Sequence, residues 1–204
     1  MRIGIIGSGK IGGTLTRLLS GLGHDVSVAN TRGPDSLAEL AAETGATAAA
    51  TPQDAVSGAD LVVIAVPLHA VPGLPDLSGK LVIDANNYYA GRDGQIAEID
   101  RGAASSRWVA GHLSGARVVK AFNTIQWSHL LERGRPAGEP GRIALPVAGD
   151  DADAKATVMA LVESLGFDAV DGGDLDDSRR QEPGTAVYGA DLDADRTRAA
   201  LAAA

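Results

Sequence analysis

The sequence predicts an α/β fold in which helices pack on both faces of a mainly parallel sheet. Two observations lead to this prediction: short apolar runs alternate with helical patterns along most of the chain, and a glycine-rich turn joins the first run to the first helix. Parallel neighbouring strands need a long crossover connection, which is usually a helix, so an alternation of strands and helices indicates a parallel sheet. The position of the glycine-rich turn narrows the prediction to a Rossmann-type, doubly wound sheet with a small C-terminal α/β extension.

The first strand and helix are predicted from the N-terminal segment. Arg2–Ile6 is a short, β-branched run of the kind found in buried parallel strands. Leucines recur three or four residues apart between Leu15 and Leu22, so one face of the following helix is apolar and can pack on the sheet. Gly23 is expected to end this helix.

The turn between this strand and helix has the sequence G-x-G-x-x-G, which indicates dinucleotide binding when it lies in this context. Gly7 allows the tight turn, Gly9 lets the backbone approach a pyrophosphate, and Gly12 permits close packing of the helix on the strand. Free N–H groups at the start of the helix can bind phosphate oxygens. The alternative is a glycine-rich turn without a ligand. The predicted cofactor-binding residues of this segment are Gly7, Ser8, Gly9, Lys10, Ile11 and Gly12.

The loop after the second predicted strand, Asp25–Ala29, indicates which dinucleotide binds. An NAD site would have an Asp or Glu there for the ribose hydroxyls, and such a side chain would repel a 2′-phosphate. This chain has Asn30, Thr31 and Arg32 instead. Thr31 can donate a hydrogen bond, and Arg32 can form charge-assisted ones. The sequence therefore predicts NADP(H), and the alternative is that Arg32 is a solvated loop residue.

The middle of the chain supplies further strands and helices of the same sheet. The clearest is the apolar run at residues 60–66, which in a doubly wound sheet lies beside the first strand. The expected strands are 46–50, 60–66, 81–84 and 118–122, and the expected helices are 34–44, 52–56 and one that contains Trp108 and Leu113.

Loops that follow these strands are expected to border the ligand, because the carboxyl ends of parallel strands lie at one edge of the sheet. Ala65, Val66 and Pro67 follow the clearest strand and should line the cofactor. Asn86 follows the next strand, and its amide can reach the nicotinamide ribose. The aromatic pair Tyr88–Tyr89 borders the same edge or packs a loop or subunit contact.

The last part of the chain adds a strand-helix-strand unit. We expect a short helix at 125–131, a loop rich in Gly, Pro and charge at 132–141, strands at 143–148 and 167–170 around a helix at 154–165, and an alanine-rich last helix. We divide the chain into an NADP(H)-binding domain, residues 1–124, and an extension, residues 125–204. The extension is expected to complete the substrate site without folding independently.

Composition and charge limit the class of protein. The chain has 204 residues, enough for one sizeable core, and its 45% hydrophobic and 22% charged residues do not indicate disorder. A net charge of −8 argues against a nucleic-acid partner, because Lys and Arg must neutralise its phosphates. The charge does not exclude an anionic cofactor, which local N–H groups and one or two arginines can bind.

Signals for membranes, secretion and metals are lacking in the sequence. No apolar segment is long enough to span a bilayer, no basic and apolar leader precedes the first strand, and the chain has no cysteine. We therefore expect a cytoplasmic protein without disulfides or thiol catalysis. No two of the four histidines have metal-ligand spacing, and the carboxylates form no ligand pattern, so we expect no metal site.

Five segments of the sequence resemble the NADPH-dependent reductases of the deazaflavin coenzyme F-420, the family of F-420:NADP oxidoreductases. The matching segments are Ile5–Gly12, Asn30–Gly33, Ala65–Pro67, Ile83–Asn87 and Val118–Thr124. The resemblance implies that the first two segments hold the NADP(H) phosphates. It also implies a homodimer, and hydride transfer between NADPH and the deazaflavin. The residues that it places around the ribose and nicotinamide are Ala65, Val66, Pro67, Asn86, Ala121, Phe122 and Asn123.

The sequence constrains the second ligand less than the cofactor. The first interpretation is a deazaflavin; the alternatives are another small acceptor, such as an imine, carbonyl, flavin or ferric chelate, and a non-catalytic NADPH-binding sensor. Ile125–Ser128 and Arg179–Gly189 are expected to close over the acceptor. Arg179 and Arg180 bind an anionic tail of F-420, or they are solvated surface charges. No catalytic acid or base is predicted, because hydride transfer chiefly needs the placement of two rings.

Overall fold

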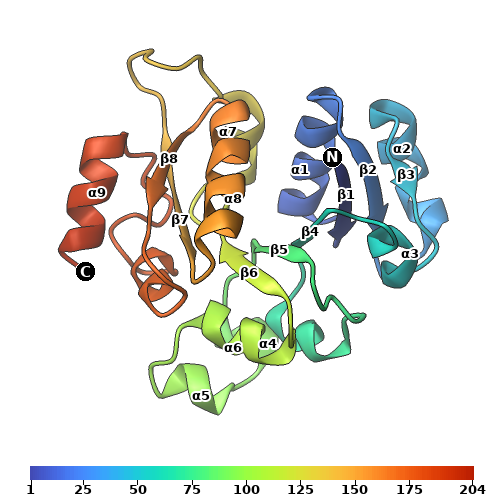
Figure 1. The fold of residues 1–204 in the computed structure, drawn as a ribbon, viewed down its shortest axis with the longest axis horizontal. Helices are drawn as coiled ribbons and strands as arrows, with labels where there is room; N and C mark the ends of the chain where they lie inside the picture. The colour runs from blue at the N-terminus through green and yellow to red at the C-terminus, as the bar shows by residue number, and fades with distance from the viewer.

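An eight-stranded sheet organises the computed structural model of the chain, which describes residues 1–204 (Figure 1). The strands lie in the order β3-β2-β1-β4-β5-β6-β7-β8, and every neighbouring pair is parallel except β6 with β7. The predicted Rossmann-type α/β fold is therefore confirmed. The strands are β1 Arg2–Ile6, β2 Asp25–Ala29, β3 Thr47–Ala48, β4 Leu61–Ile64, β5 Leu81–Asp84, β6 Arg117–Lys120, β7 Ala144–Gly149 and β8 Asp168–Asp171.

Helices surround this sheet (Figure 1). None of them combines the length and hydrophobicity needed to cross a bilayer. The α-helices are α1 Lys10–Gly21, α2 Ala38–Thr44, α3 Pro52–Val56, α4 Ala90–Asp93, α5 Ala97–Asp100, α6 Ser105–His112, α7 Trp127–Glu132, α8 Ala152–Ser164 and α9 Ala194–Ala202. The 3₁₀ helices are η1 Pro34–Leu37, η2 Leu68–Gly73 and η3 Asp177–Gln181.

Two layers of core follow from the alternation of side chains along the strands. In β4, Leu61 and Val63 belong to a cluster of 28 buried residues that includes side chains of α1, α2, α7 and α8. Val62 and Ile64 belong to a second cluster, of 13 buried residues, shared with α3, α5 and α6. A smaller cluster joins α9 to β7 and β8 at the end of the sheet. The helices therefore cover both faces, as a doubly wound sheet requires.

Some elements differ in extent from the sequence prediction. The third strand pairs with β2 over Thr47 and Ala48 alone, because the run is mostly alanine, which favours strands weakly and buries little surface. The helix expected from residue 125 begins at Trp127, since Ile125 is buried in the main core and Gln126 has an extended backbone. The one-turn helices α4 and α5 have no counterpart in the prediction.

A buried ion pair joins Asp84, the last residue of β5, to Lys120, the last residue of β6. Both side chains are inaccessible to solvent, and Lys120 Nζ lies 3.2 Å from Asp84 Oδ2. Ser106 Oγ donates a hydrogen bond to the same carboxylate at 2.6 Å, and Lys120 Nζ also donates to the carbonyl of Asn86. Buried charges persist when they are paired and hydrogen-bonded. This network therefore fixes the two strand ends against each other.

Replacement of Lys120 by Met should lower the free energy of unfolding by about 3–5 kcal/mol, because Asp84 would become an uncompensated buried charge. Arg117→Met, at the exposed first position of the same strand, is the matched control and should change stability by less than about 0.5 kcal/mol. Urea unfolding of both variants measures the difference. Equal stability of the two variants would show that the ion pair does not secure the strand ends.

Candidate cofactor and substrate site

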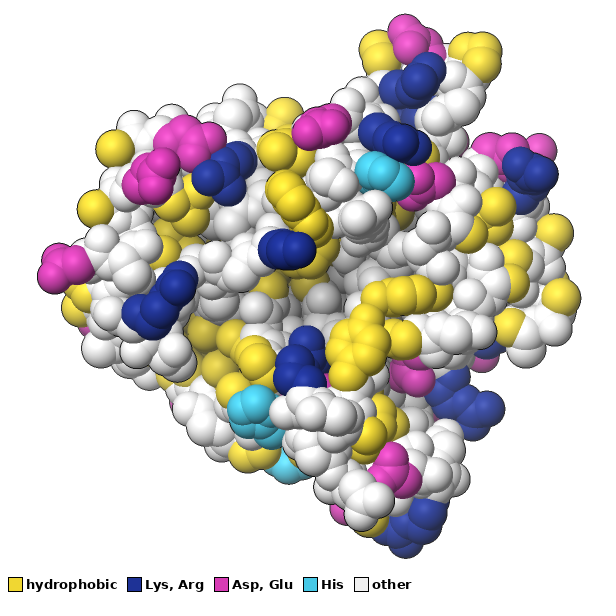
Figure 2. Space-filling view, turned by 180° about the vertical axis from the view of Figure 1, so that it is seen from behind, with side chains coloured by type: hydrophobic (Ala, Val, Ile, Leu, Met, Phe, Trp, Pro, Cys, Tyr) yellow, Lys and Arg dark blue, Asp and Glu magenta, His cyan; other side chains and the backbone are white.

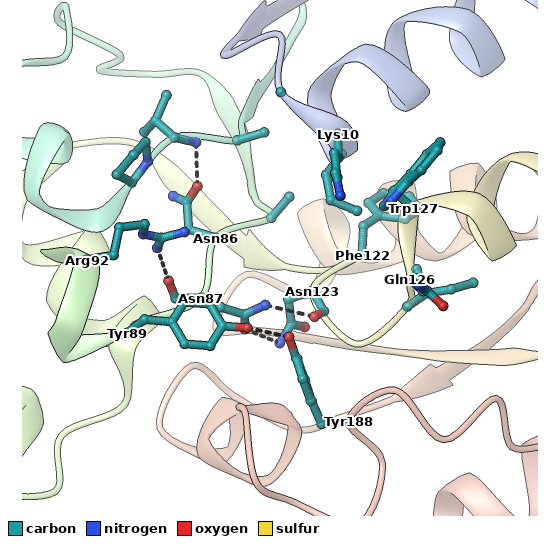
Figure 3. Close-up of a pocket in the computed structure, with 17 residues that line it drawn as sticks. Lys10, Asn86, Asn87, Tyr89, Arg92, Phe122, Asn123, Gln126, Trp127 and Tyr188 are labelled. Atoms are coloured by element: carbon teal, nitrogen blue, oxygen red, sulfur yellow. Dashed lines mark hydrogen bonds between the residues drawn. The ribbon is translucent and has the colours of Figure 1, made fainter.

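A cavity of about 470 Å³ lies at the carboxyl ends of β1, β4, β5 and β6, where the sheet order brings several loops together (Figure 3). This edge is where doubly wound sheets bind ligands. The face of the molecule turned away in Figure 1 is hollowed near its centre, with hydrophobic and basic side chains around the depression (Figure 2). None of the 17 residues that line the cavity is acidic, and Lys10, which makes no ion pair, contributes positive charge, whereas the charge of Arg92 is paired with Asp93. The cavity therefore suits an anionic ligand despite the net charge of −8.

The glycine-rich turn at the cavity owes its shape to Gly7 and Gly12. Gly7 has a φ of +104°, which L side chains rarely adopt. A Cβ at Gly12 would lie 1.9 Å from the carbonyl oxygen of Gly7, so α1 approaches the turn more closely than any other residue permits. A Cβ at Gly9 would meet no atom within 4 Å. Gly7 and Gly12 therefore build the turn, and Gly9 leaves open space beside it.

The N-terminus of α1 has no side-chain cap. Gly9 occupies the N-cap position without a side-chain hydrogen bond, and the first turn has no acidic residue. Side chains cap α3, α8 and α9, whereas α2, α4, α5, α6 and α7, like α1, have no side-chain cap. The N–H groups at the start of a helix carry partial positive charge and need acceptors. The start of α1 can therefore bind an anionic group that enters the open space beside Gly9.

A second, smaller hollow of about 260 Å³ shares Gly9 and Lys10 with the cavity. Arg32 also lines it, and the guanidinium of Arg32 forms no hydrogen bond or ion pair. Arg17, on the same hollow, is instead held by Glu43 at 2.7 Å, and the hydrogen bond to Glu43 raises the pKa of Arg17. Arg32 is therefore available to a ligand in a way that Arg17 is not.

Asn30 holds the loop that carries Arg32 against the glycine-rich turn. Its Nδ2 donates to Ser8 Oγ at 2.7 Å and to Ser36 Oγ at 2.9 Å. Its Oδ1 accepts from the backbone N–H of Arg32 at 2.8 Å. The side chain of Asn30 is thus used within the protein, and its part in the site is to position its neighbours.

Lys10 and Trp127 meet where the two hollows join. Both residues line both hollows, and Lys10 Nζ lies 5.6 Å from the centre of the Trp127 ring. This is within the range of a cation–π contact. Figure 3 shows Trp127 beside Lys10, across the cavity from Asn86. A ligand that occupies both hollows must pass this contact.

Asn86 borders the cavity on the side of β5. Its Oδ1 accepts a hydrogen bond from the backbone N–H of Val66 at 2.7 Å, and Asp84 Oδ1 accepts one from the backbone N–H of Asn86 at 3.0 Å. Its Nδ2 is buried and has no hydrogen-bond acceptor. Since buried donors are normally paired, this amide is suited to donate to a ligand.

Phe122 and Asn123 form the wall that follows β6. Phe122 is buried with a φ of +63°, a strained conformation for a residue with a side chain, and such strain persists where the surroundings impose it. Asn123 Nδ2 donates to the carbonyl of Gln181 at 2.7 Å, and Gln181 Nε2 donates to Asn123 Oδ1 at 2.9 Å. Asn123 therefore lines the cavity and also fastens the extension to β6.

Tyr89, Tyr188 and Arg92 form a further part of the cavity wall. The two hydroxyl oxygens lie 2.5 Å apart, and the Arg92 guanidinium lies 5.1 Å from the centre of the Tyr89 ring. Burial, followed by the hydrogen bond with Tyr89, raises the pKa of Tyr188 to about 12. Arg92 is held by Asp93 at 2.8 Å. Burial alone would raise the pKa of Asp93, but hydrogen bonds from Arg92 and two backbone N–H groups lower it overall.

The structure brings most of the predicted cofactor residues together. Gly7 and Gly12 shape the turn, and Asn30 supports it, whereas Thr31 is exposed and Ala121 is fully buried, so that neither of these lines a hollow. Their roles toward a cofactor stay predictions. Ser8 and Arg32 line the smaller hollow, and the residues that line the cavity are Gly9, Lys10, Ile11, Ala65, Val66, Pro67, Asn86 and Asn123.

Of the two interpretations of Arg179 and Arg180, the structure favours surface charges over contacts to an acceptor. η3 directs Arg179 to the carbonyl of Gly102, where Nη1 donates at 2.9 Å, and Arg180 to Asp177 at 2.7 Å. Neither residue lines the cavity. The same tail instead contributes Tyr188.

Of the residues that line the cavity, Arg92 has no site role in the sequence analysis. Trp127 and Tyr188 lie in the two segments expected to close over the acceptor, and Tyr89 lies at the predicted ligand edge. Nothing in the sequence singles out these three residues within their segments.

This sheet order, with a glycine-rich turn at the junction of two hollows, defines a Rossmann-type dinucleotide-binding protein. The family model described as "NADP oxidoreductase coenzyme F420-dependent" matches residues 2–88. A solved structure from Arthrobacter sp. FB24, described as a "putative F420 dependent NADP-reductase", is 30% identical. The match covers 88% of this chain and 87% of that one, with a TM-score of 0.72. The chain belongs to this family of NADP oxidoreductases.

The chain is also similar to two further proteins. The structure of the hypothetical protein SMa0349 from Sinorhizobium meliloti is 32% identical, with 94% of this chain and 95% of that one covered and a TM-score of 0.79. The F420-dependent NADP reductase of Methanothermobacter thermautotrophicus is 34% identical over 142 residues, which are 64% of this chain and 59% of that protein. The chain spans 36%, 43% and 59% of the lengths of three curated relatives that it matches.

Gly12→Ala should lower the free energy of unfolding by about 1–3 kcal/mol, the usual effect of overpacking, because its Cβ would overlap the Gly7 carbonyl. Gly13→Ala is the matched control: it lies next in α1, gains the same helix propensity, and its Cβ would have only ordinary contacts of 3.5 Å or more. This variant should be as stable as the unmodified protein or more so. Thermal and urea unfolding distinguish the two; similar stabilities would contradict the close approach at Gly12.

Proposed function

We propose that the protein binds NADP(H) across both hollows and transfers a hydride between NADPH and a second ligand in the cavity. The observation that carries this proposal is the unpaired guanidinium of Arg32, in a hollow that shares Gly9 and Lys10 with the cavity. An unpaired arginine beside a dinucleotide-binding turn is suited to a 2′-phosphate. The absence of an acidic residue at the end of β2 supports the same choice.

The residues present fit NADP(H) along its length. Arg32 would bind the 2′-phosphate, and the uncapped start of α1 beside Gly9 would bind the pyrophosphate. The unpaired Nδ2 of Asn86 would donate to the nicotinamide half. Lys10, which makes no ion pair within the protein, adds positive charge between these ends.

When bound, the nicotinamide supplies the hydride, so the protein mainly binds and orients the reactants. Ala65, Val66 and Ile125 present apolar surface to the cavity and would exclude water from the reacting atoms. Asn86 holds the backbone of Val66 in place. No side chain has to form a covalent intermediate for this reaction.

Coenzyme F-420 is the acceptor that we propose first. Support comes from the description of the family model and from the names of two relatives, the Arthrobacter and Methanothermobacter proteins. The homodimer and the cytoplasmic location expected from the sequence stay predictions.

Arg32→Ala should weaken NADPH binding by roughly 1.5–3 kcal/mol, the range for hydrogen bonds to charged groups, and should leave NADH binding almost unchanged. Calorimetric titration of each variant with NADPH and with NADH measures the two dissociation constants. Arg196→Ala removes an exposed arginine from α9, at the opposite end of the sheet, and is the control. Equal dissociation constants of the unmodified protein for NADPH and NADH would contradict the proposed choice of cofactor.

Gly9→Val should abolish NADPH binding while the protein remains folded. The new side chain would occupy the open space proposed for the pyrophosphate, and its Cβ would meet no protein atom within 4 Å. The same titration, together with thermal unfolding, tests both parts of this expectation. A folded variant with undiminished NADPH affinity would show that the glycine-rich loop is only a turn.

A further inference from the structure

Two tyrosine hydroxyls meet in the wall of the cavity although their residues lie far apart in the sequence. Tyr89 follows β5, and Tyr188 lies in the segment between η3 and α9. Their oxygens are 2.5 Å apart, and both side chains line the cavity (Figure 3). When one hydroxyl donates to another, the accepting hydroxyl keeps its own hydrogen. The pair therefore offers one O–H group that is not used between the two tyrosines.

We propose that the Tyr89–Tyr188 pair donates a hydrogen bond to the acceptor, an inference that rests on the proposed function. The acceptor is then a compound with a conjugated C=N or C=O group. A deazaflavin, an imine and a carbonyl compound share this chemistry. A ferric chelate does not, because it accepts one electron at the metal and needs no proton beside it.

The hydride leaves the nicotinamide with its electron pair and forms a C–H bond at the acceptor carbon, so NADPH is oxidised to NADP⁺. The π electrons of the C=N or C=O group move to the nitrogen or oxygen. That atom takes a proton from the free tyrosine hydroxyl, which regains a proton from water through its partner. Overall, one hydride and one solvent proton are added to the acceptor.

The surroundings of the pair suit a neutral donor connected to solvent. The hydroxyl of Tyr188 is neutral at pH 7, as in an ordinary tyrosine, since burial and the bond with Tyr89 raise rather than lower its pKa. Tyr89 is 41% exposed, so water can reach its side chain. Arg92 stacks on the Tyr89 ring but gives its hydrogen bonds to Asp93 and to the carbonyl of Asn87, which leaves the hydroxyls free of it.

The pair also connects the part of the chain before residue 124 to the extension, so a purely structural role must be distinguished from donation. Tyr88 provides the matched control. Its hydroxyl lies 2.8 Å from Asp100 Oδ1 and 3.1 Å from the carbonyl oxygen of Gly94, the two acceptors open to its single hydrogen, and it accepts a hydrogen bond from the backbone N–H of Ile96 at 3.2 Å. The residue does not line the cavity. The substitution Tyr88→Phe removes hydrogen bonds of the same kind but leaves the proposed donor pair unchanged.

The test compares the unmodified protein with Tyr88→Phe and with the double variant Tyr89→Phe, Tyr188→Phe. NADPH binding is measured by titration, and the binding of oxidised F-420 to the NADP⁺ complex by its difference spectrum. Single-turnover oxidation of bound NADPH is then followed with F-420, with a cyclic imine and with ferricyanide, which takes electrons without a proton. Thermal unfolding reports any structural effect.

We expect the double variant to bind NADPH within about twofold of the unmodified protein and to bind oxidised F-420 more weakly. The rate of hydride transfer to F-420 or to the cyclic imine, whichever the unmodified protein reduces faster, should fall about a hundredfold. This is the usual effect of removing one hydrogen-bond donor to a developing negative charge. Ferricyanide reduction should hold within about twofold, and Tyr88→Phe should match the unmodified protein throughout.

Several results would overturn the proposal. One is an equal loss with all acceptors, accompanied by lower thermal stability, which would indicate a structural clasp. A second is an unchanged rate of hydride transfer in the double variant. A third is that the unmodified protein binds NADPH and reduces ferricyanide but neither F-420 nor the cyclic imine. A protein that fails to bind NADPH at all would instead refute the proposed function, and the inference with it.

Discussion

The candidate site depends on the buried ion pair between Asp84 and Lys120. Neither charge contacts solvent, so each must be compensated within the protein. Compensation involves both backbone polar groups of Asn86: its N–H donates to Asp84, and its carbonyl accepts from Lys120. The side chain of Asn86 in turn holds the N–H of Val66. One charge pair thus sets the positions of the loops after β4 and β5, which form a large part of the cavity.

The cavity is completed where the extension returns to the parallel part of the sheet. β7 runs antiparallel to β6, and the chain after β8 reaches the cavity edge through η3. Two contacts secure that return: the paired amides of Asn123 and Gln181, and the paired hydroxyls of Tyr89 and Tyr188. The turn that would bind the cofactor is therefore local in sequence, whereas the surface that would meet the acceptor combines distant segments.

This difference explains what could be predicted from the sequence. The turn at Gly7–Gly12 and the apolar strand before it are specified by neighbouring residues, so the fold followed from local patterns. The roles of Ala121 and Phe122 could not be separated, because the positive φ that turns Phe122 into the wall is imposed by the surroundings. Likewise, Arg179 and Tyr188 lie on one tail, but only tertiary packing decides that the tyrosine reaches the cavity.

A protein with a net charge of −8 can still have an anion site, because anion binding depends on unpaired positive groups nearby rather than on the net charge. Exposed charges farther apart than a Debye length are largely screened. What a phosphate would meet is therefore set by the groups within contact distance. Arg17 is neutralised by Glu43, whereas Arg32 is unpaired and the start of α1 is uncapped. Since an arginine already bound to a carboxylate must break that contact before it binds a phosphate, the unpaired Arg32 is the side chain best placed to distinguish a 2′-phosphate from a hydroxyl.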